Sequence, residues 1–165
     1  MEAKAHDDHE VEPAESRTWD RVLRVFFATT PHRLLSAYSR RSSKSPIEQI
    51  VVIGRRTGTV RRHNVSVYDI DGAMYVGHPN GAAHWTRNLE AGGGVLVRRG
   101  SPPMRVRAIP LAPGPERSAV IAAGGEQPFP AGLLYRSARA HIEAVGTYYR
   151  LEPLEGQARA YFGPR

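Results

Sequence analysis

The chain has 165 residues, a length typical of a single domain whose core is large enough to fold without disulfides or structural metals. It contains no cysteine, which excludes disulfides, thiolate metal sites and cysteine nucleophiles. No apolar run approaches the ~18 residues that a membrane span needs, and the N-terminus is acidic and polar rather than signal-like. We therefore expect a cytoplasmic protein without an integral membrane span.

The positive charge is concentrated beyond residue 20. The net charge is +7, yet residues 1–20 hold seven of the 16 acidic side chains and only two of the 23 basic ones. Residues 21–165 therefore carry 21 basic and 9 acidic side chains, a charge of +12. Such a body attracts nucleic acid, an anionic membrane surface or a polyanionic small molecule. We expect no nucleic-acid partner, because aromatic residues do not interleave with the arginines in a stacking pattern.

The N-terminal region divides into a tail and a helix. Residues 1–16 are polar, acidic and aperiodic, which predicts a disordered tail, and residues 17–165 are expected to form one domain. An apolar stripe at helical spacing, beginning at Trp19, predicts a helix over residues 19–40 that Pro31 breaks or restarts. We favour packing of this helix on a β-barrel. A basic amphipathic helix in peripheral contact with a membrane is the alternative.

Residues 47–76 have the pattern of three strands joined by a basic turn and a tight turn. A run of β-branched residues at 50–53 is typical of a buried strand. In the basic turn at residues 54–62, two glycines permit an unusual backbone and leave backbone N–H groups open to a bound group. Four guanidinium groups surround it, each able to grip phosphate or carboxylate oxygens in bidentate fashion. They belong to Arg55, Arg56, Arg61 and Arg62. Spacing alone also allows these arginines to be solvated surface charge.

The remaining elements indicate an α+β fold that is mainly β. Asp71 and Gly72 predict a tight hairpin turn, residues 77–84 a turn-rich loop, and residues 85–91 a short helix closed by three glycines. Alternation and helix-start signals predict the later elements. The expected strands are 95–99, 104–111 and 147–151, and the expected helices are 113–123 and 133–144.

The side chains that hydrolases and metalloenzymes use are not arranged in familiar motifs. The seven histidines include no His-x-His or His-x-x-x-His pair, and no Gly-x-Ser-x-Gly elbow occurs. We therefore expect no metal site. With nine acids beyond residue 20, paired acid and base carboxylates are also scarce. This composition favours a protein that binds an anionic cofactor and lets the cofactor do the chemistry.

Two segments on either side of the Asp71-Gly72 turn carry a pair of motifs. Residues 54–61 read Gly-Arg-Arg-Thr-Gly-Thr-Val-Arg, and residues 84–89 read His-Trp-Thr-Arg-Asn-Leu. They resemble the Gly-Arg-Lys-Thr/Ser-Gly-x-x-Arg signature and the Trp-Tyr-x-Asn-Leu segment of the deazaflavin-dependent nitroreductase family. The resemblance covers residues 47–111 and continues more weakly to 153. It implies a split β-barrel with flanking helices that binds coenzyme F420, an 8-hydroxy-5-deazaflavin with a phosphodiester and a glutamate tail.

The resemblance also implies which residues would hold the coenzyme. Arg55, Arg56 and Thr57 would bind the phosphate and the tail, the backbone of the second strand and the loop after the third would edge the ring, and Trp85 and Asn88 would close its other side. The full set of implied cofactor-binding residues is Arg55, Arg56, Thr57, Gly58, Arg61, Arg62, His63, Asn64, Val65, Gly77, His78, Pro79, Asn80, Trp85 and Asn88.

Two regions depart from the family pattern. Residues 78–80 read His-Pro-Asn where the family has small-Ser-Asn or small-Ser-Lys, so a hydroxyl group is missing near the ring. The C-terminal part shapes the substrate pocket in the family, and here Tyr135, Tyr148 and Tyr149 form no clear tyrosine cluster. The resemblance therefore informs the coenzyme more than the acceptor.

The implied activity is that of an F420-dependent reductase. It would transfer a hydride from C5 of the reduced deazaflavin to an electron-poor small molecule such as a quinone, a nitro compound or an enone. The protein would supply orientation and charge complementarity without an obligatory catalytic acid. Tyr135 or His78 could donate a proton on the substrate side. The alternative is a non-catalytic split-barrel carrier of a lipid or another anionic or apolar ligand, and a monomer or a homodimer is expected in either case.

Overall fold

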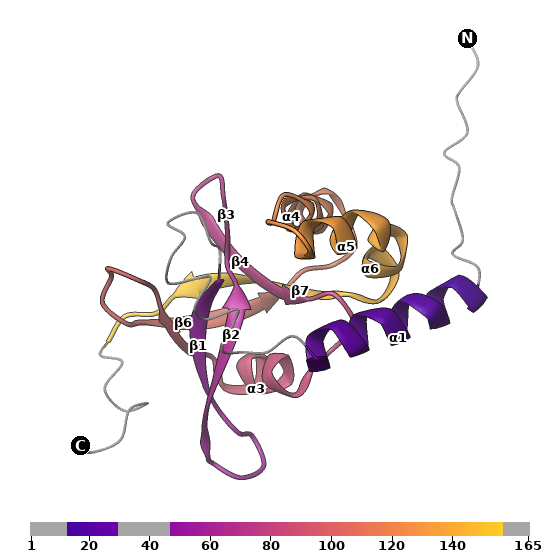
Figure 1. Ribbon diagram of the computed structural model, residues 1–165. Coiled ribbons are helices and arrows are strands. Elements are labelled where there is room, and N and C mark those ends of the chain that lie inside the picture. The colour runs from indigo at the N-terminus through magenta and orange to yellow at the C-terminus, as the bar shows by residue number, and fades with distance from the viewer. Residues whose placement is uncertain (1–12, 30–46, 157–165) are drawn as a thin grey trace.

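The computed structural model describes residues 13–29 and 47–156. One curled antiparallel sheet is flanked by helices (Figure 1). The seven strands are β1 (Ile47–Ile53), β2 (Val60–Ser66), β3 (Tyr68–Ile70), β4 (Ala73–His78), β5 (Gly94–Val97), β6 (Met104–Pro110) and β7 (Thr147–Pro153). The helices are α1 (Pro13–Thr29), α3 (His84–Gly92), α4 (Pro115–Gly125), α5 (Ala131–Ser137) and α6 (Arg139–Val145).

The connection from β2 to β3 explains why the sheet curls. The strand order is β2-β1-β5-β6-β7-β4-β3, so β2 and β3 form its two edges. Yet β2 ends at Ser66 and β3 begins at Tyr68, with Val67 alone between them. A chain can pass from one edge to the other within one residue only if the sheet curls until these two edges approach each other at Val67. The result is a half-barrel, and it confirms the predicted α+β, mainly β class.

Two apolar clusters occupy opposite faces of the strands. The first cluster joins the sheet to α3 and contains Ile50, Val52, Val65, Val67, Val76, Leu89, Leu96, Val106, Ala108, Tyr149 and Leu151. The second cluster joins the sheet to α1, α4, α5 and α6 and contains Leu23, Tyr68, Tyr75, Val120, Ile121, Tyr135, Ala138, Ile142 and Tyr148. Neighbouring residues on one strand enter different clusters, because successive side chains point to opposite faces. Of the three C-terminal tyrosines, Tyr135 and Tyr148 enter the second cluster beside Tyr68 and Tyr75, whereas Tyr149 enters the first cluster.

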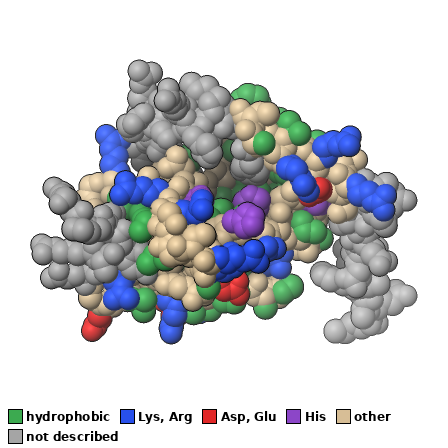
Figure 2. Space-filling model, turned by 90° about the horizontal axis from the view of Figure 1, so that it is seen from below, with side chains coloured by type: hydrophobic (Ala, Val, Ile, Leu, Met, Phe, Trp, Pro, Cys, Tyr) green, Lys and Arg blue, Asp and Glu red, His purple; other side chains and the backbone are tan. Residues whose placement is uncertain are grey.

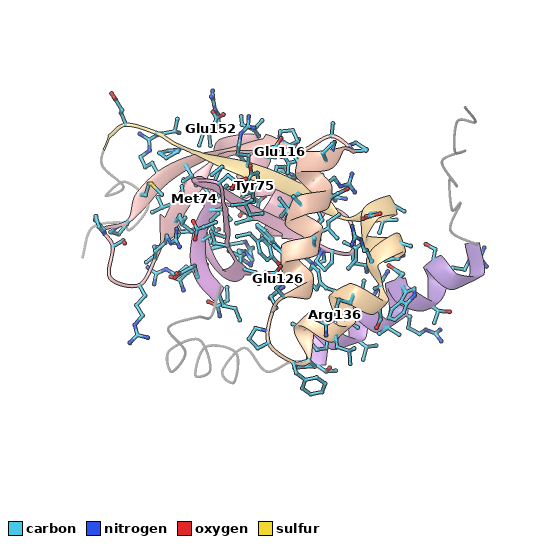
Figure 3. All side chains as sticks on the ribbon, turned by 90° about the horizontal axis from the view of Figure 1, so that it is seen from above. Met74, Tyr75, Glu116, Glu126, Arg136 and Glu152 are labelled. Atoms are coloured by element: carbon cyan, nitrogen blue, oxygen red, sulfur yellow. The ribbon has the colours of Figure 1, made fainter. Side chains whose placement is uncertain are left out.

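A polar network fastens α4 to the sheet. The Tyr75 hydroxyl donates to Glu116 Oε1 at 3.0 Å, and Arg150 Nη1 donates to the same oxygen at 2.9 Å. Arg150 Nη2 also lies 3.7 Å from Glu152 Oε1. Figure 3 labels Tyr75, Glu116 and Glu152, which lie near one another where α4 crosses the strands. Glu116 lies in the first turn of α4, where a carboxylate also complements the helix dipole.

Several predicted boundaries differ from the structure. Helix α1 begins at Pro13, so residues 13–16 are helical rather than part of a disordered tail, and the expected continuation to residue 40 lies outside the described residues. The single helix predicted over 133–144 is two helices, α5 and α6. They separate at Ala138, whose ψ of 15° leaves the helical range while its side chain packs into the second cluster.

Helix α1 packs against the rest of the fold, as favoured over the membrane-surface alternative. Leu23 is fully buried in the second cluster and Trp19 packs against it. Contacts with α6 extend this packing (Figure 1). Within the described ranges, none of the helices combines the length and the apolar character needed to cross a bilayer.

Candidate functional site

The turn between β1 and β2 closes on itself. The Gly54 N–H donates to the Thr59 carbonyl at 2.8 Å, and the Gly54 carbonyl accepts from the N–H groups of Thr57 at 3.1 Å and Gly58 at 2.8 Å. Gly58 has a φ of +66°, which glycine adopts at low cost. The Thr59 N–H donates to Thr57 Oγ1 at 3.3 Å. The turn therefore uses these N–H groups internally, and the expectation that they are open to a bound group is wrong.

Asn88 of α3 holds the first arginine of the turn. Its Oδ1 accepts from the Arg55 backbone N–H at 3.2 Å and from Arg55 Nη1 at 2.9 Å. Asn88 is 5% exposed, so the acceptor is nearly withdrawn from water. Arg55 itself is exposed. A buried amide thus orients an exposed guanidinium group and ties the turn to α3.

An aromatic pair lies between the same two parts of the molecule. The rings of His63 on β2 and Trp85 on α3 have centroids 6.3 Å apart and planes inclined by 30°. Trp85 and Asn88 are three residues apart and share one face of α3. Arg61 and His63 are two residues apart and share one face of β2. One side of α3 therefore contacts both the aromatic residue of β2 and the arginine of the turn.

The predicted residues of β2 are divided between its two faces. Arg61 and Arg62 belong to the strand rather than to the turn, because β2 begins at Val60. By strand alternation Arg61, His63 and Val65 lie on one face, whereas Arg62 and Asn64 lie on the other. Val65 is buried in the first cluster. Only the outer end of this face, at Arg61 and His63, is therefore available to a ligand through its side chains.

The exposed arginines are a basic surface. Arg55, Arg56 and Arg61 are exposed, and none of them takes part in an ion pair within the described part of the chain. Figure 2 shows basic side chains in blue and histidines in purple on the side of the molecule that is lowest in Figure 1. We call Arg55, Arg56, Arg61, His63, Trp85 and Asn88 the arginine face.

The predicted loop at residues 77–80 makes contacts elsewhere. Gly77 and His78 end β4 and pair with Tyr148 and Thr147 of β7. His78 Nδ1 lies 3.1 Å from the Gly81 carbonyl, and burial lowers the pKa of His78, which favours the neutral imidazole. The side chain of Asn80 contacts α1 and α6 instead of the turn. Pro79, which lies between His78 and Asn80 in the sequence, is buried.

Tyr135, the other candidate proton donor, lies under the helices. It is 6% exposed and belongs to the second cluster. Its ring packs directly over Gly124, where an added Cβ would come within 2.2 Å of Tyr135 Cδ1. Burial raises the pKa of Tyr135 well above its ordinary value, so the hydroxyl group stays protonated.

Three polar residues that no sequence motif indicated gather around Asn80. Ser16, Asp20 and His141 join it in a hydrogen-bonded group beside a cavity. Ser16 and His141 are 125 positions apart, so no motif spacing connects them. Local sequence patterns did not connect them either, since Ser16 lies in the predicted tail and Asp20 and His141 lie in different predicted helices. In the described ranges, no three histidine or acidic side chains gather as a metal site requires.

Comparisons with known proteins identify no family. No family model matches the chain, and no curated protein does. Among solved structures, the crystal structure of Atu2129 from Agrobacterium tumefaciens, a protein of unknown function, matches with a TM-score of 0.48 and 15% identity over 78% of this chain. This chain spans 57% of the Agrobacterium protein. A second solved structure matches with a TM-score of 0.43 and 15% identity, covering 75% of this chain and 84% of the other.

Proposed function

We propose that this protein binds coenzyme F420 on the arginine face and serves as an F420-dependent reductase of an electron-poor small molecule. A quinone, a nitro compound or an enone would be such an acceptor. The observation that carries the proposal is the double contact of α3, with Asn88 on Arg55 and Trp85 beside His63. It sets cationic forks next to aromatic rings on one surface, as a flat heterocycle with an anionic tail requires.

The donor set of the arginine face suits a polyanion. Exposed guanidinium groups without an ion pair within the described residues are available for bidentate contacts to phosphate or carboxylate oxygens. Asn88 already restrains Arg55, which lowers the conformational entropy lost when a ligand binds. The backbone of the turn contributes little, since the N–H groups of Gly54, Thr57, Gly58 and Thr59 bond within the turn and that of Arg55 bonds to Asn88. Affinity would therefore depend on side chains and on salt.

The chain's own residues would bind and orient, and the reduced coenzyme would supply the hydride. Arg55, Arg56 and Arg61 would hold the anionic tail, and His63 with Trp85 would offer ring surfaces for stacking. Holding the two reactants in a productive geometry is a large part of such catalysis, and it needs no acid or base. Tyr135 and His78 remain predictions as proton donors.

Fluorescence titration with oxidised F420 and with FMN tests the binding. We expect F420 to bind at least about tenfold more tightly, because its tail adds carboxylates to the single phosphate that both share. Arg55→Ala and Arg56→Ala should each weaken binding by about 1.5–3 kcal/mol, the range for hydrogen bonds to charged groups. Higher salt should weaken the wild type more than either variant. Arg107→Ala is the matched control, since Arg107 is an exposed arginine on β6 paired with Glu152 at 2.6 Å.

Two results would contradict the proposal. The first is equal or tighter binding of FMN, or a loss of F420 binding free energy below about 0.5 kcal/mol in both turn variants. Either outcome would show that the arginines are solvated surface charge. Tight F420 binding without turnover of any quinone, nitro compound or enone would favour the carrier alternative over the reductase.

A further inference from the structure

A second candidate site lies between α1, the loop after β4, and α6. A cavity of about 330 Å³ opens there, lined by Ser16, Arg17, Asp20, Asn80, Gly81, His141 and Val145. None of these residues belongs to the arginine face. The volume is at the lower end of the ~300–1,000 Å³ range of ligand pockets, so it suits a small molecule. Its lining combines one arginine, one carboxylate, three further polar side chains and the apolar side chain of Val145.

The orientation of the Asn80 amide follows from its neighbours. Asn80 Nδ2 donates to Asp20 Oδ1 at 2.9 Å and lies 3.3 Å from the Asp20 backbone carbonyl. A carboxylate and a carbonyl only accept hydrogen bonds, so the NH₂ end of the amide must face α1. The Oδ1 end consequently faces α6, where it lies 2.9 Å from His141 Nε2.

The amide in turn determines the tautomer of His141. Because Asn80 Oδ1 only accepts, Nε2 of His141 must carry the proton. In the neutral ring the lone pair is then on Nδ1, which lies 3.2 Å from Ser16 Oγ. His141 is 2% exposed, and burial lowers its pKa although the charge of Asp20 opposes this effect. The neutral imidazole therefore accepts the Ser16 hydroxyl proton in a hydrogen bond.

The helix that carries His141 is itself held in place. Arg117 of α4 is buried and donates from Nη2 to the carbonyls of Glu143 at 2.9 Å and Gly146 at 2.6 Å. A cation at the C-terminal end of a helix also complements its dipole. Ile142, next to His141, is fully buried in the second cluster. The base is thus positioned by α4 and the core independently of α1, which supplies the serine.

We propose that Ser16 is a nucleophile activated by His141 and oriented through Asn80 and Asp20, and that the cavity takes a small carboxylic ester or thioester as an acyl donor. A hydroxyl, a neutral imidazole and an orienting amide within hydrogen-bond reach are the arrangement of nucleophilic catalysis. If the hydrogen bonds of Ser16 served only to attach α1 to the fold, Ser16 would not need to line a cavity, because buried Leu23 already attaches this helix.

The chemistry balances with water as the only co-reactant. Ser16 Oγ bonds to the carbonyl carbon of the donor while His141 Nδ1 takes the hydroxyl proton. The carbon–oxygen or carbon–sulfur bond of the donor breaks, and the alcohol or thiol leaves with that proton. Water, deprotonated by the same nitrogen, then cleaves the acyl-serine ester, which releases a carboxylic acid and restores the hydroxyl. In both attacks the carbonyl oxygen of the acyl group gains negative charge. Arg17, beside Ser16 in the lining, is the cation available to stabilise this oxyanion.

Full-length protein and p-nitrophenyl acetate provide the test. We expect a burst of about one equivalent of p-nitrophenolate, as acyl-enzyme accumulation gives, and one acetyl group mapped to Ser16 by peptide mass spectrometry. Ser16→Ala should abolish the burst, whereas Ser137→Ala, at an exposed serine that ends α5, should leave it unchanged. Ser16→Cys retains a nucleophile and should still be acylated, which separates lost chemistry from lost folding. His141→Gln should slow acylation at least about 100-fold.

The pH dependence of the acylation rate distinguishes a base from a structural residue, because a His141 with a purely structural role would not impose it. The groups facing His141 are Ser16 and Asp20 on α1 and Asn80 on the loop, with Arg17 in the same lining. Acylation should increase with pH through a single step below the ordinary histidine value of about 6.5 and then level off. Acetylation at other sites, an undiminished burst in Ser16→Ala, or an unchanged rate in His141→Gln would overturn the proposal. F420 binding in Ser16→Ala should equal the wild type, since the two sites share no residue in these roles.

Discussion

The arginine face and the Ser16 cavity use polar side chains in opposite ways. On the arginine face, the guanidinium groups are exposed to water, so salt screens their charges and each group contributes to binding separately. In the cavity, Asp20, Asn80, His141 and Ser16 form a series in which each hydrogen bond sets the direction of the next. Loss of one arginine should remove one contribution, whereas loss of one member of the series should disable all of it.

The two sites also depend on different parts of the core. The arginine face is supported by the first cluster through α3, whose Leu89 is fully buried. The cavity is supported by the second cluster through α1 and α6. A substitution in one cluster should therefore disturb one site more than the other, and this separation can be tested.

The largest expected effect is that of Leu23→Ala. Leu23 is fully buried where α1 meets the second cluster, so its truncation should lower the free energy of unfolding by about 3 kcal/mol. Val25 on the same helix is 54% exposed, and Val25→Ala should change stability by less than about 0.5 kcal/mol. Urea unfolding measures both. Acylation should fall in Leu23→Ala while F420 binding of the folded protein persists, and equal losses at the two sites would contradict their separation.

Gly77→Ala should have the next largest effect on stability. An added Cβ at Gly77 would lie 2.1 Å from Tyr148 Cδ1, so the ring or the strand must shift, at a cost of about 2 kcal/mol. Gly92 in α3 has no heavy atom within 4 Å of the corresponding position, and Gly92→Ala should be neutral or slightly stabilising. Thermal unfolding of both variants decides the matter. A neutral Gly77→Ala would mean that the second cluster is looser than its packing suggests.

Asn88→Ala probes the attachment of the turn to α3. It removes the acceptor of two Arg55 donors and should cost about 1 kcal/mol of stability. Coenzyme binding should weaken several-fold, because the freed Arg55 loses its orientation. Asn88→Asp keeps an acceptor and should retain the stability. If Asn88→Ala bound F420 as tightly as the wild type, the pre-orientation of Arg55 would be irrelevant to the face.

The smallest effect concerns mild acid. Burial lowers the pKa of His141 and of His78, so the unfolded chain binds protons at higher pH than the folded one. The contribution of these two histidines to the free energy of unfolding is complete above the ordinary histidine pKa of about 6.5, and it is lost as the pH falls through and below that value. Asp20, whose pKa is lowered chiefly by its bond with Asn80, acts only at more acidic pH. Denaturant midpoints between pH 7.5 and 5 should decline, and less so in His141→Gln.

Local signals predicted most elements of the fold. The Asp71-Gly72 turn is confirmed, with φ of 49° and 80° at its two residues. Helix α3 and its glycine end are confirmed, because the signals for a short helix lie within the helix itself. Boundaries that depend on packing were missed, notably the break at Ala138 and the start of β2 at Val60. Of the predicted site, the sequence placed the arginines near one another but not the buried Asn88 contact that holds Arg55.

The sequence by itself determined the alternating strands, the basic hairpin and the excess of positive charge, since these follow from local residue patterns and from composition. Only the tertiary structure decided that β2 and β3 form opposite edges of a curled sheet, and that Tyr148 and Tyr149 enter different clusters. It also decided that Ser16 meets His141 across 125 positions and that Asn80 lies between α1 and α6. Such contacts leave no period in the sequence, because they form only when distant elements pack and exclude water from the polar groups between them.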